Sequence, residues 1–238
     1  MSALYLVNIL VVVVAAWAVW ERRLALGSRW DAPITWGIAL FGAGAALDSP
    51  WPGVAAASFP LTGRYYLLMV MAHFCYLAGA AMGIRSVYLR LLPDGAIDGF
   101  MRAKMLTPIA LASAVMVVCV LASPISTTMP ADHLYLVRPD GWMAAYWVAF
   151  LGALGALEMV SMYGLNLLRG DQRSAMVGLL IASQAVGTLA IGCIGVAVLS
   201  GRGGVAQTLV WPFAYAGIIG GSIAAVVSWR FRVRSLVS

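Results

Sequence analysis

Residues 142–168, WMAAYWVAFLGALGALEMVSMYGLNLL, decide the fold of this chain. At a rise of about 1.5 Å per residue, a helix of this length is about 40 Å long and can cross the roughly 30 Å hydrocarbon core of a bilayer. Its only charged residue is Glu158. The stretch therefore predicts a membrane-spanning helix with a carboxyl group deep inside it.

The same apolar pattern recurs along the whole chain. Hydrophobic residues occupy 63% of the 238 positions and charged residues 10%, whereas a soluble domain carries about 25% charge. Apolar runs of roughly 20 residues lie at 3–20, 32–48, 65–86, 106–125, 142–168, 175–199 and 208–229. These runs lack the short alternating pattern of a barrel, and backbone groups in lipid must be satisfied within a segment. We therefore predict an all-α polytopic membrane protein, a single domain over 1–238 with seven transmembrane helices.

The fifteen basic residues are divided unevenly between the predicted loops. One side receives twelve of them, namely Arg22, Arg23, Arg29, Arg85, Arg90, Arg102, Lys104, Arg169, Arg173, Arg230, Arg232 and Arg234, and the other side receives Arg64, Arg138 and Arg202. Because Lys and Arg are enriched in cytoplasmic loops, this distribution predicts an external N-terminus and a cytoplasmic C-terminus. No small-residue cleavage site stands out before Glu21, so the first helix is expected to be retained. The arginines at the cytoplasmic rim are expected to attract anionic lipid headgroups.

Two groups of polar residues lie inside the predicted spans. Glu158 and Gln184 fall about 4 Å to the cytoplasmic side of their span centres, and a short turn joins the two spans, so a hydrogen bond between them is plausible. His73, Asn8 and Tyr215 fall about 2 to 8 Å to the outer side of theirs, and Asp48 lies at the outer mouth. Such residues suit a proton pathway or a small polar ligand. Alternatively, each bonds a neighbouring helix, which contributes about 0.6 kcal/mol on average.

Several function classes find no support in the sequence. The chain has two histidines, His73 and, in a predicted external loop, His133, which is too few for a zinc site that needs three or four converging ligands. No HExxH, GxSxG or phosphate-binding loop is present. The only lysine, Lys104, lies at the predicted cytoplasmic rim, which excludes a retinal Schiff base in the seventh span. We expect no catalysis, no metal and no cofactor, and, without a soluble basic domain, no binding to nucleic acid.

The positions of prolines and glycines bear on whether the chain is a transporter and on how its helices pack. Pro33, Pro108 and Pro212 are expected in or near the first turns of their spans, a pattern that fits a transporter with broken helices poorly. The pairs Gly79/Gly83 and Gly217/Gly221 have the spacing that allows helices to approach closely, within the chain or between copies.

Three passages carry a resemblance to a known family: LDSPWPGVAAASFPLTG at 47–63, LLMVMAHFCYLAGAAMGI at 67–84 and NLLRGDQRSAMVGLLIASQAVG at 166–187. Together with the arginine-rich third loop, they resemble the membrane half of an actinobacterial family of seven-helix integral membrane proteins labelled as transporters or regulators. The resemblance covers most of residues 1–230 and implies an actinobacterial plasma membrane and a regulatory or transport-linked role. Longer members add a cytoplasmic C-terminal region, whereas this sequence runs nine residues beyond Trp229.

These observations give two expected functions. The first is a non-enzymatic membrane sensor or accessory subunit that binds a lipid, a small molecule or a partner membrane or cytoplasmic protein, and acts through another chain. The alternative is a small proton-coupled transporter, with Glu158 as the titrating group and His73 and Gln184 in the pathway. A polar, hydrated cavity that joins Glu158 to His73 would favour the transporter, whereas a dry core with an exposed apolar face would favour the subunit.

Overall fold

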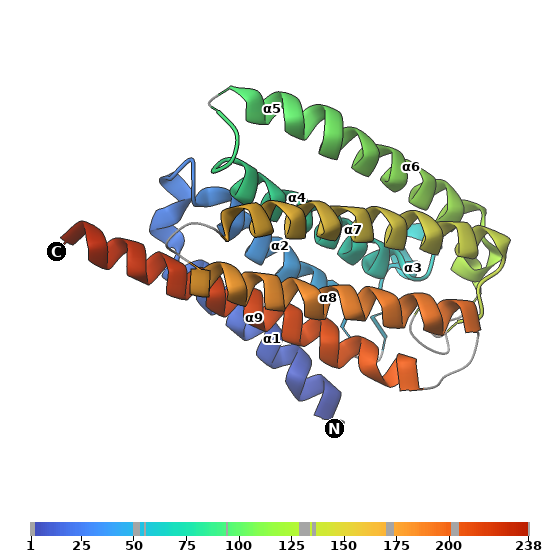
Figure 1. Ribbon diagram of the computed structural model, residues 1–238. Helices are drawn as coiled ribbons and strands as arrows, with labels where there is room; N and C mark the ends of the chain where they lie inside the picture. The colour runs from blue at the N-terminus through green and yellow to red at the C-terminus, as the bar shows by residue number, and fades with distance from the viewer. Residues whose placement is uncertain are drawn as a thin grey trace.

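The computed structural model describes residues 3–49, 53–54, 56–93, 95–128, 134, 137–169, 174–200 and 205–237, and every regular element among them is helical. In chain order these are α1 (Ala3–Glu21), the 3₁₀ helix η1 (Arg23–Gly27), α2 (Ala32–Leu47), α3 (Phe59–Thr62), α4 (Leu67–Tyr88), α5 (Ala96–Phe100), the π-helical segment η2 (Met101–Leu106), α6 (Thr107–Ala122), the 3₁₀ helix η3 (Pro124–Thr127), α7 (Gly141–Leu168), α8 (Ser174–Ser200) and α9 (Val205–Val237). The predicted all-α class is confirmed. The long helices run side by side in an elongated bundle (Figure 1).

The helices have the length and surface of a membrane-embedded protein. Among the described residues, five segments are long and apolar enough to cross a bilayer: Leu67–Tyr88, Ala96–Ala122, Gly141–Leu168, Val177–Ser200 and Thr208–Arg234. Two further apolar helices are shorter, Tyr5–Glu21 and Ala32–Leu47. Large apolar side chains face outward, and Leu111, Val148 and Leu199 are 68%, 71% and 85% exposed. Lipid is the solvent that such a surface requires.

The fourth predicted span differs most from the structure. The sequence predicted 106–125, but α5, η2 and α6 form one helical segment from Ala96 to Ala122. Pro108 suggested a first turn at this point. In the structure, the wider π-helical turns of η2 precede Pro108 and accommodate a residue that lacks a backbone N–H. The helix ends at Ala122 because Ser123, before Pro124, is extended.

Pro212 also lies elsewhere than expected. The sequence placed it near the first turn of its span, but α9 begins at Val205, so that Pro212 lies inside the helix. A proline at an interior position removes one backbone hydrogen bond of the helix. The proline pattern therefore weighs less against a transporter than the sequence suggested.

Five helices form a closed ring, and two lie outside it. Neighbour contacts run from α2 to α4, from α4 to α7, from α7 to α8, from α8 to α9 and from α9 back to α2. Helix α1 packs on the outside of this ring against α2 and α9, and α6 packs on the outside against α7. In Figure 1, α6 and α1 accordingly lie at opposite sides of the bundle.

Glycines allow the closest approaches between neighbouring helices. A Cβ on Gly37 of α2 would lie 3.2 Å from the carbonyl oxygen of Gly79 in α4, and a Cβ on Gly42 would lie 2.7 Å from the Cβ of Ala15 in α1. Between α8 and α9, the hydroxyl of Ser183 donates to the carbonyl oxygen of Gly217 at 2.6 Å. Gly79 and Gly217 from the two predicted glycine pairs thus serve packing within the chain.

One end of the bundle holds a buried charge cluster that the sequence did not reveal. Asp31, only 5% exposed, lies 2.5 Å from Arg232 Nη1, 3.5 Å from Arg90 Nη2 and 4.0 Å from Arg22 Nη2. We call these four residues the Asp31 cluster. It joins the end of α1, the start of α2, the end of α4 and the C-terminal part of α9.

Arg22 is the most deeply buried member of the Asp31 cluster, with 2% of its surface exposed. Its Nη1 donates to the carbonyl oxygen of Ala225 at 2.6 Å and its Nε to Thr35 Oγ1 at 3.1 Å. Burial lowers the pKa of Arg22 to about 10, which Asp31 partly opposes. Arg22 is therefore still protonated at neutral pH and needs the buried carboxylate beside it.

Candidate functional site

A cavity of about 210 Å³ lies inside the ring formed by α2, α4, α7, α8 and α9. Its wall is mainly apolar, with Ile38, Leu154, Leu157 and Ile191 among the lining residues. Aromatic rings from several helices also line it, namely Phe41, His73, Tyr76, Trp147, Phe150 and Trp211. This is the usual make-up of a small-molecule pocket, in which a few polar groups are set in an apolar wall.

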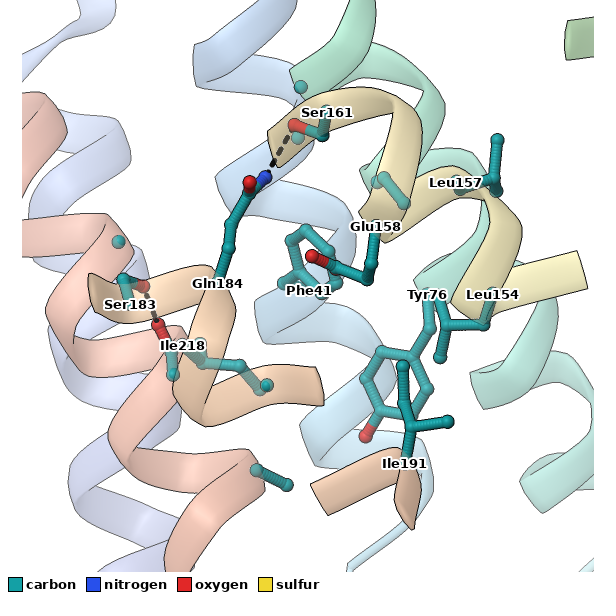
Figure 2. A pocket seen from close by; sticks show the side chains of 18 of the residues that line it. Phe41, Tyr76, Leu154, Leu157, Glu158, Ser161, Ser183, Gln184, Ile191 and Ile218 are labelled. Carbon is teal, nitrogen blue, oxygen red and sulfur yellow. Dashed lines mark hydrogen bonds between the residues drawn. The ribbon is translucent and has the colours of Figure 1, made fainter. Parts of the chain in front are cut away.

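Glu158 is the principal polar group in the cavity. Its side chain projects from α7 into the space beside the ring of Phe41 (Figure 2). Its Oε2 is buried and has no hydrogen-bond partner among the described residues. A carboxyl group in this position is costly unless a ligand, a proton or a water satisfies it. The sequence therefore identified a carboxyl group that the described side chains leave partly unsatisfied.

Gln184 lies on α8 next to Glu158 but does not bond to it. Its Nε2 donates to Ser161 Oγ at 2.5 Å (Figure 2). Ser161 lies three residues after Glu158, on the same face of α7. It therefore competes with Glu158 for the N–H groups of the Gln184 amide. The Oε1 of Gln184 is buried and, like Glu158 Oε2, has no partner in the described part of the chain.

His73 lies further along the cavity, in an aromatic cluster between α4 and α7. Its ring stacks on Phe150 with centroids 4.1 Å apart, and its Nδ1 hydrogen-bonds the hydroxyl of Tyr146. Phe150 precedes Glu158 by eight residues, which places His73 about 12 Å from Glu158 along α7. The cavity therefore contains both groups, but no direct hydrogen bond joins them.

The remaining three predicted site residues fall into two places. Asp48, which directly follows α2, lines the cavity. Asn8 and Tyr215 lie together outside it: Asn8 Nδ2 donates to Tyr215 Oη at 2.7 Å and to the carbonyl oxygen of Ala45 at 3.0 Å. This pair ties α1 to α9 and α2. The structure thus brings Glu158, Gln184, His73 and Asp48 to one cavity and puts Asn8 and Tyr215 at a helix interface.

The charge balance of the cavity is one-sided. Two carboxyl groups, Glu158 and Asp48, line it, whereas no arginine or lysine appears among the described residues of its wall. Arg22, the one buried arginine among the described residues, belongs to the Asp31 cluster at one end of the bundle. Nor does the part of the chain that the structure describes bring together three His, Cys, Asp or Glu side chains that could hold a metal ion. The second histidine, His133, lies outside the described residues.

The fold and the cavity define the chain as an all-α, membrane-embedded protein with an internal cavity. No protein-family model matches it, and comparisons with curated proteins and with solved structures find no match either. The resemblance to an actinobacterial membrane family therefore stays a prediction.

Proposed function

We propose that this chain is a seven-helix protein of a bacterial plasma membrane that binds a small molecule in its internal cavity and acts as a non-enzymatic sensor or accessory subunit. The observation that carries the proposal is the unpartnered Glu158 Oε2 inside a cavity with apolar walls. A bound molecule would satisfy this atom, which the protein's own described side chains leave unsatisfied. Among a lipid, a small molecule and a partner protein, a small molecule is favoured by a mainly apolar cavity with a few polar groups inside the ring of five helices.

The proposed topology has α1 and α2 as membrane spans beside the five longer segments. With 19 and 16 residues, these helices are about 28 and 24 Å long. A span of this length is accommodated by local thinning of the bilayer or by flanking residues that reach the interface. The arginines of the Asp31 cluster all lie at one end of the bundle. In the proposed orientation, with the N-terminus outside and the C-terminus in the cytoplasm, this end is cytoplasmic and meets anionic headgroups.

The test is native mass spectrometry of the chain purified in a mild detergent. The proposal expects a small molecule bound at about one copy per chain, which is released when the protein is unfolded. A chain that carries only lipids that exchange freely with the detergent would contradict small-molecule binding. A stoichiometric second polypeptide would favour the accessory subunit over the sensor and would direct the functional question to that partner.

One observation supports the alternative, a proton-coupled transporter. The same cavity is lined by Glu158, His73 and Asp48, which are groups able to exchange protons. The gap between Glu158 and His73, about 12 Å along the axis of α7, would then have to be bridged by water or substrate. The test is proton flux in liposomes with wild type and Glu158→Gln. Flux that the variant abolishes at unchanged expression would establish the transporter, and absence of flux in the wild type would leave the binding protein.

A further inference from the structure

We propose that the cavity takes an organic cation, a molecule with an apolar body and one ammonium or similar cationic group that pairs with the Glu158 carboxylate. This inference rests on the proposed function, because it assigns a chemical class to the small molecule that the cavity binds. It goes beyond that function by predicting which charge is accepted and which is refused.

The charges that line the cavity favour a cationic ligand. Within the described lining of the cavity, Glu158 and Asp48 are acidic and no arginine or lysine is present. An anionic ligand would meet like charges in a medium of low dielectric, where their repulsion is strong. A cation would neutralise a carboxylate that otherwise remains unpaired in the membrane interior. The cavity therefore favours a ligand with a positive charge.

The hydrogen-bonding groups near Glu158 also favour a cationic ligand. Among the described residues, the buried side-chain oxygens without a partner are Glu158 Oε2 and Gln184 Oε1, and both are acceptors. Their side chains project from α7 and α8 into the same region (Figure 2). An ammonium group has several N–H donors and no acceptor, and it complements such a pair. Trp147 Nε1, which is also buried without a partner in the described part of the chain, lies eleven residues from Glu158, about 16 Å along α7, and so does not contact the same group.

The aromatic and aliphatic residues in the cavity wall also suit an organic cation. The ring of Phe41 borders the Glu158 carboxyl in the close view of the cavity (Figure 2). Aromatic faces attract cations, by roughly 2 kcal/mol or more where water is excluded. The other lining residues around Glu158, including Leu154, Leu157 and Leu180, suit a hydrocarbon body. A small inorganic ion would leave this apolar space empty.

The test uses three probes of one shape and different charge: phenethylamine as the cation, 2-phenylethanol as the neutral analogue and phenylacetate as the anion. Binding is measured by titration calorimetry on the full chain in lipid nanodiscs, with empty nanodiscs as the blank. We expect phenethylamine to bind at least tenfold more tightly than 2-phenylethanol, and phenylacetate to bind least. Equal or tighter binding of the alcohol or of phenylacetate would overturn the inference while leaving the cavity as a binding site.

Two variants test whether Glu158 is the residue that pairs with the cation. Glu158→Gln should reduce the affinity for phenethylamine to that for 2-phenylethanol and leave the alcohol unchanged. Glu21→Gln is the matched control, because Glu21 pairs with Arg230 at 2.9 Å outside the cavity, and it should change neither. Unchanged amine binding by folded Glu158→Gln would also overturn the inference, and the wild-type series decides the matter if this variant does not fold. Failure of all three probes to bind the wild type would overturn the inference, whereas the proposed function would still be decided by native mass spectrometry of the purified chain.

Discussion

Gln184 Nε2 donates to Ser161 Oγ at 2.5 Å, and this bond across the α7–α8 interface withholds from Glu158 the partner that the sequence suggested. The amide is oriented by a neutral hydroxyl, so its own oxygen is also left without a partner. A bundle in which Gln184 satisfied Glu158 would have needed no ligand. The arrangement observed instead leaves two acceptors beside a cavity, and the account of function is built on them.

The Asp31 cluster should be the most sensitive polar contact in the fold. Asp31→Asn removes a buried carboxylate shared by three arginines and leaves Arg22 without its charge partner, so we expect a loss of about 3 to 5 kcal/mol in the free energy of unfolding. Thermal unfolding in detergent measures this loss of stability. The matched control is Asp98→Asn: Asp98 pairs with Arg85 at 3.0 Å, but its side chain is 74% exposed, and the loss should stay below about 1 kcal/mol. Similar losses in both variants would contradict a structural role for the cluster.

The contact between α1 and α2 should not tolerate an added methyl group at Gly42. In Gly42→Ala the new Cβ would lie 2.7 Å from the Cβ of Ala15, and neither atom can rotate away, so the helices must separate at a cost of about 1 to 3 kcal/mol. Gly152→Ala in α7 is the control, because a Cβ there meets nothing within 4 Å. We expect Gly152→Ala to leave stability unchanged or to raise it by up to about 1 kcal/mol. Equal stability of the two variants in the same unfolding assay would argue against this packing of α1.

Asn8 and Tyr215 should act as a structural pair and not as ligand-binding residues. In a double-mutant cycle of Asn8→Ala and Tyr215→Phe, the 2.7 Å hydrogen bond should appear as a coupling of about 0.6 kcal/mol and at most about 1.7 kcal/mol. Neither residue lines the cavity, so the affinity for phenethylamine should not change. A tenfold weaker affinity in either folded variant would show that the cavity extends to this interface.

The proposed topology can be tested by labelling single cysteines in intact cells with a membrane-impermeant maleimide. Leu61 and Leu24, 91% and 78% exposed, lie at opposite ends of the bundle. We expect Leu61→Cys to be labelled from outside and Leu24→Cys only after the membrane is made permeable. The unsubstituted chain, with Cys75, Cys119 and Cys193, gives the background. Labelling of Leu24→Cys in intact cells would reverse the orientation.

The sequence predicted the helices well because lipid thickness and backbone hydrogen bonding fix their length and type. The predicted range 142–168 lies within α7, and 175–199 lies within α8. The largest error in a helix start is at 106–125, where the helical segment in fact begins at Ala96 and the π-helical η2 precedes Pro108.

The site was less predictable, because depth in the membrane says nothing about which face of a helix a residue occupies. Asn8 and His73 have similar predicted depths, yet only His73 faces the cavity. The burial of Asp31 could not be predicted from the sequence, since a carboxylate in a loop rich in arginine is expected to be exposed at the membrane rim. Its burial depends on Arg90 and Arg232, which are 59 and 201 residues away in the chain.

Native mass spectrometry of wild type, Gly187→Leu and Gly192→Leu compares how much of the bound small molecule each protein retains. Gly187 lines the cavity and Gly192 lies on an exposed part of the same helix, and a Cβ at either position meets nothing within 4 Å. The account predicts that wild type and Gly192→Leu retain the molecule, whereas Gly187→Leu, which fills the cavity, folds but loses it. Equal retention by all three proteins would contradict the claim that this cavity is the binding site.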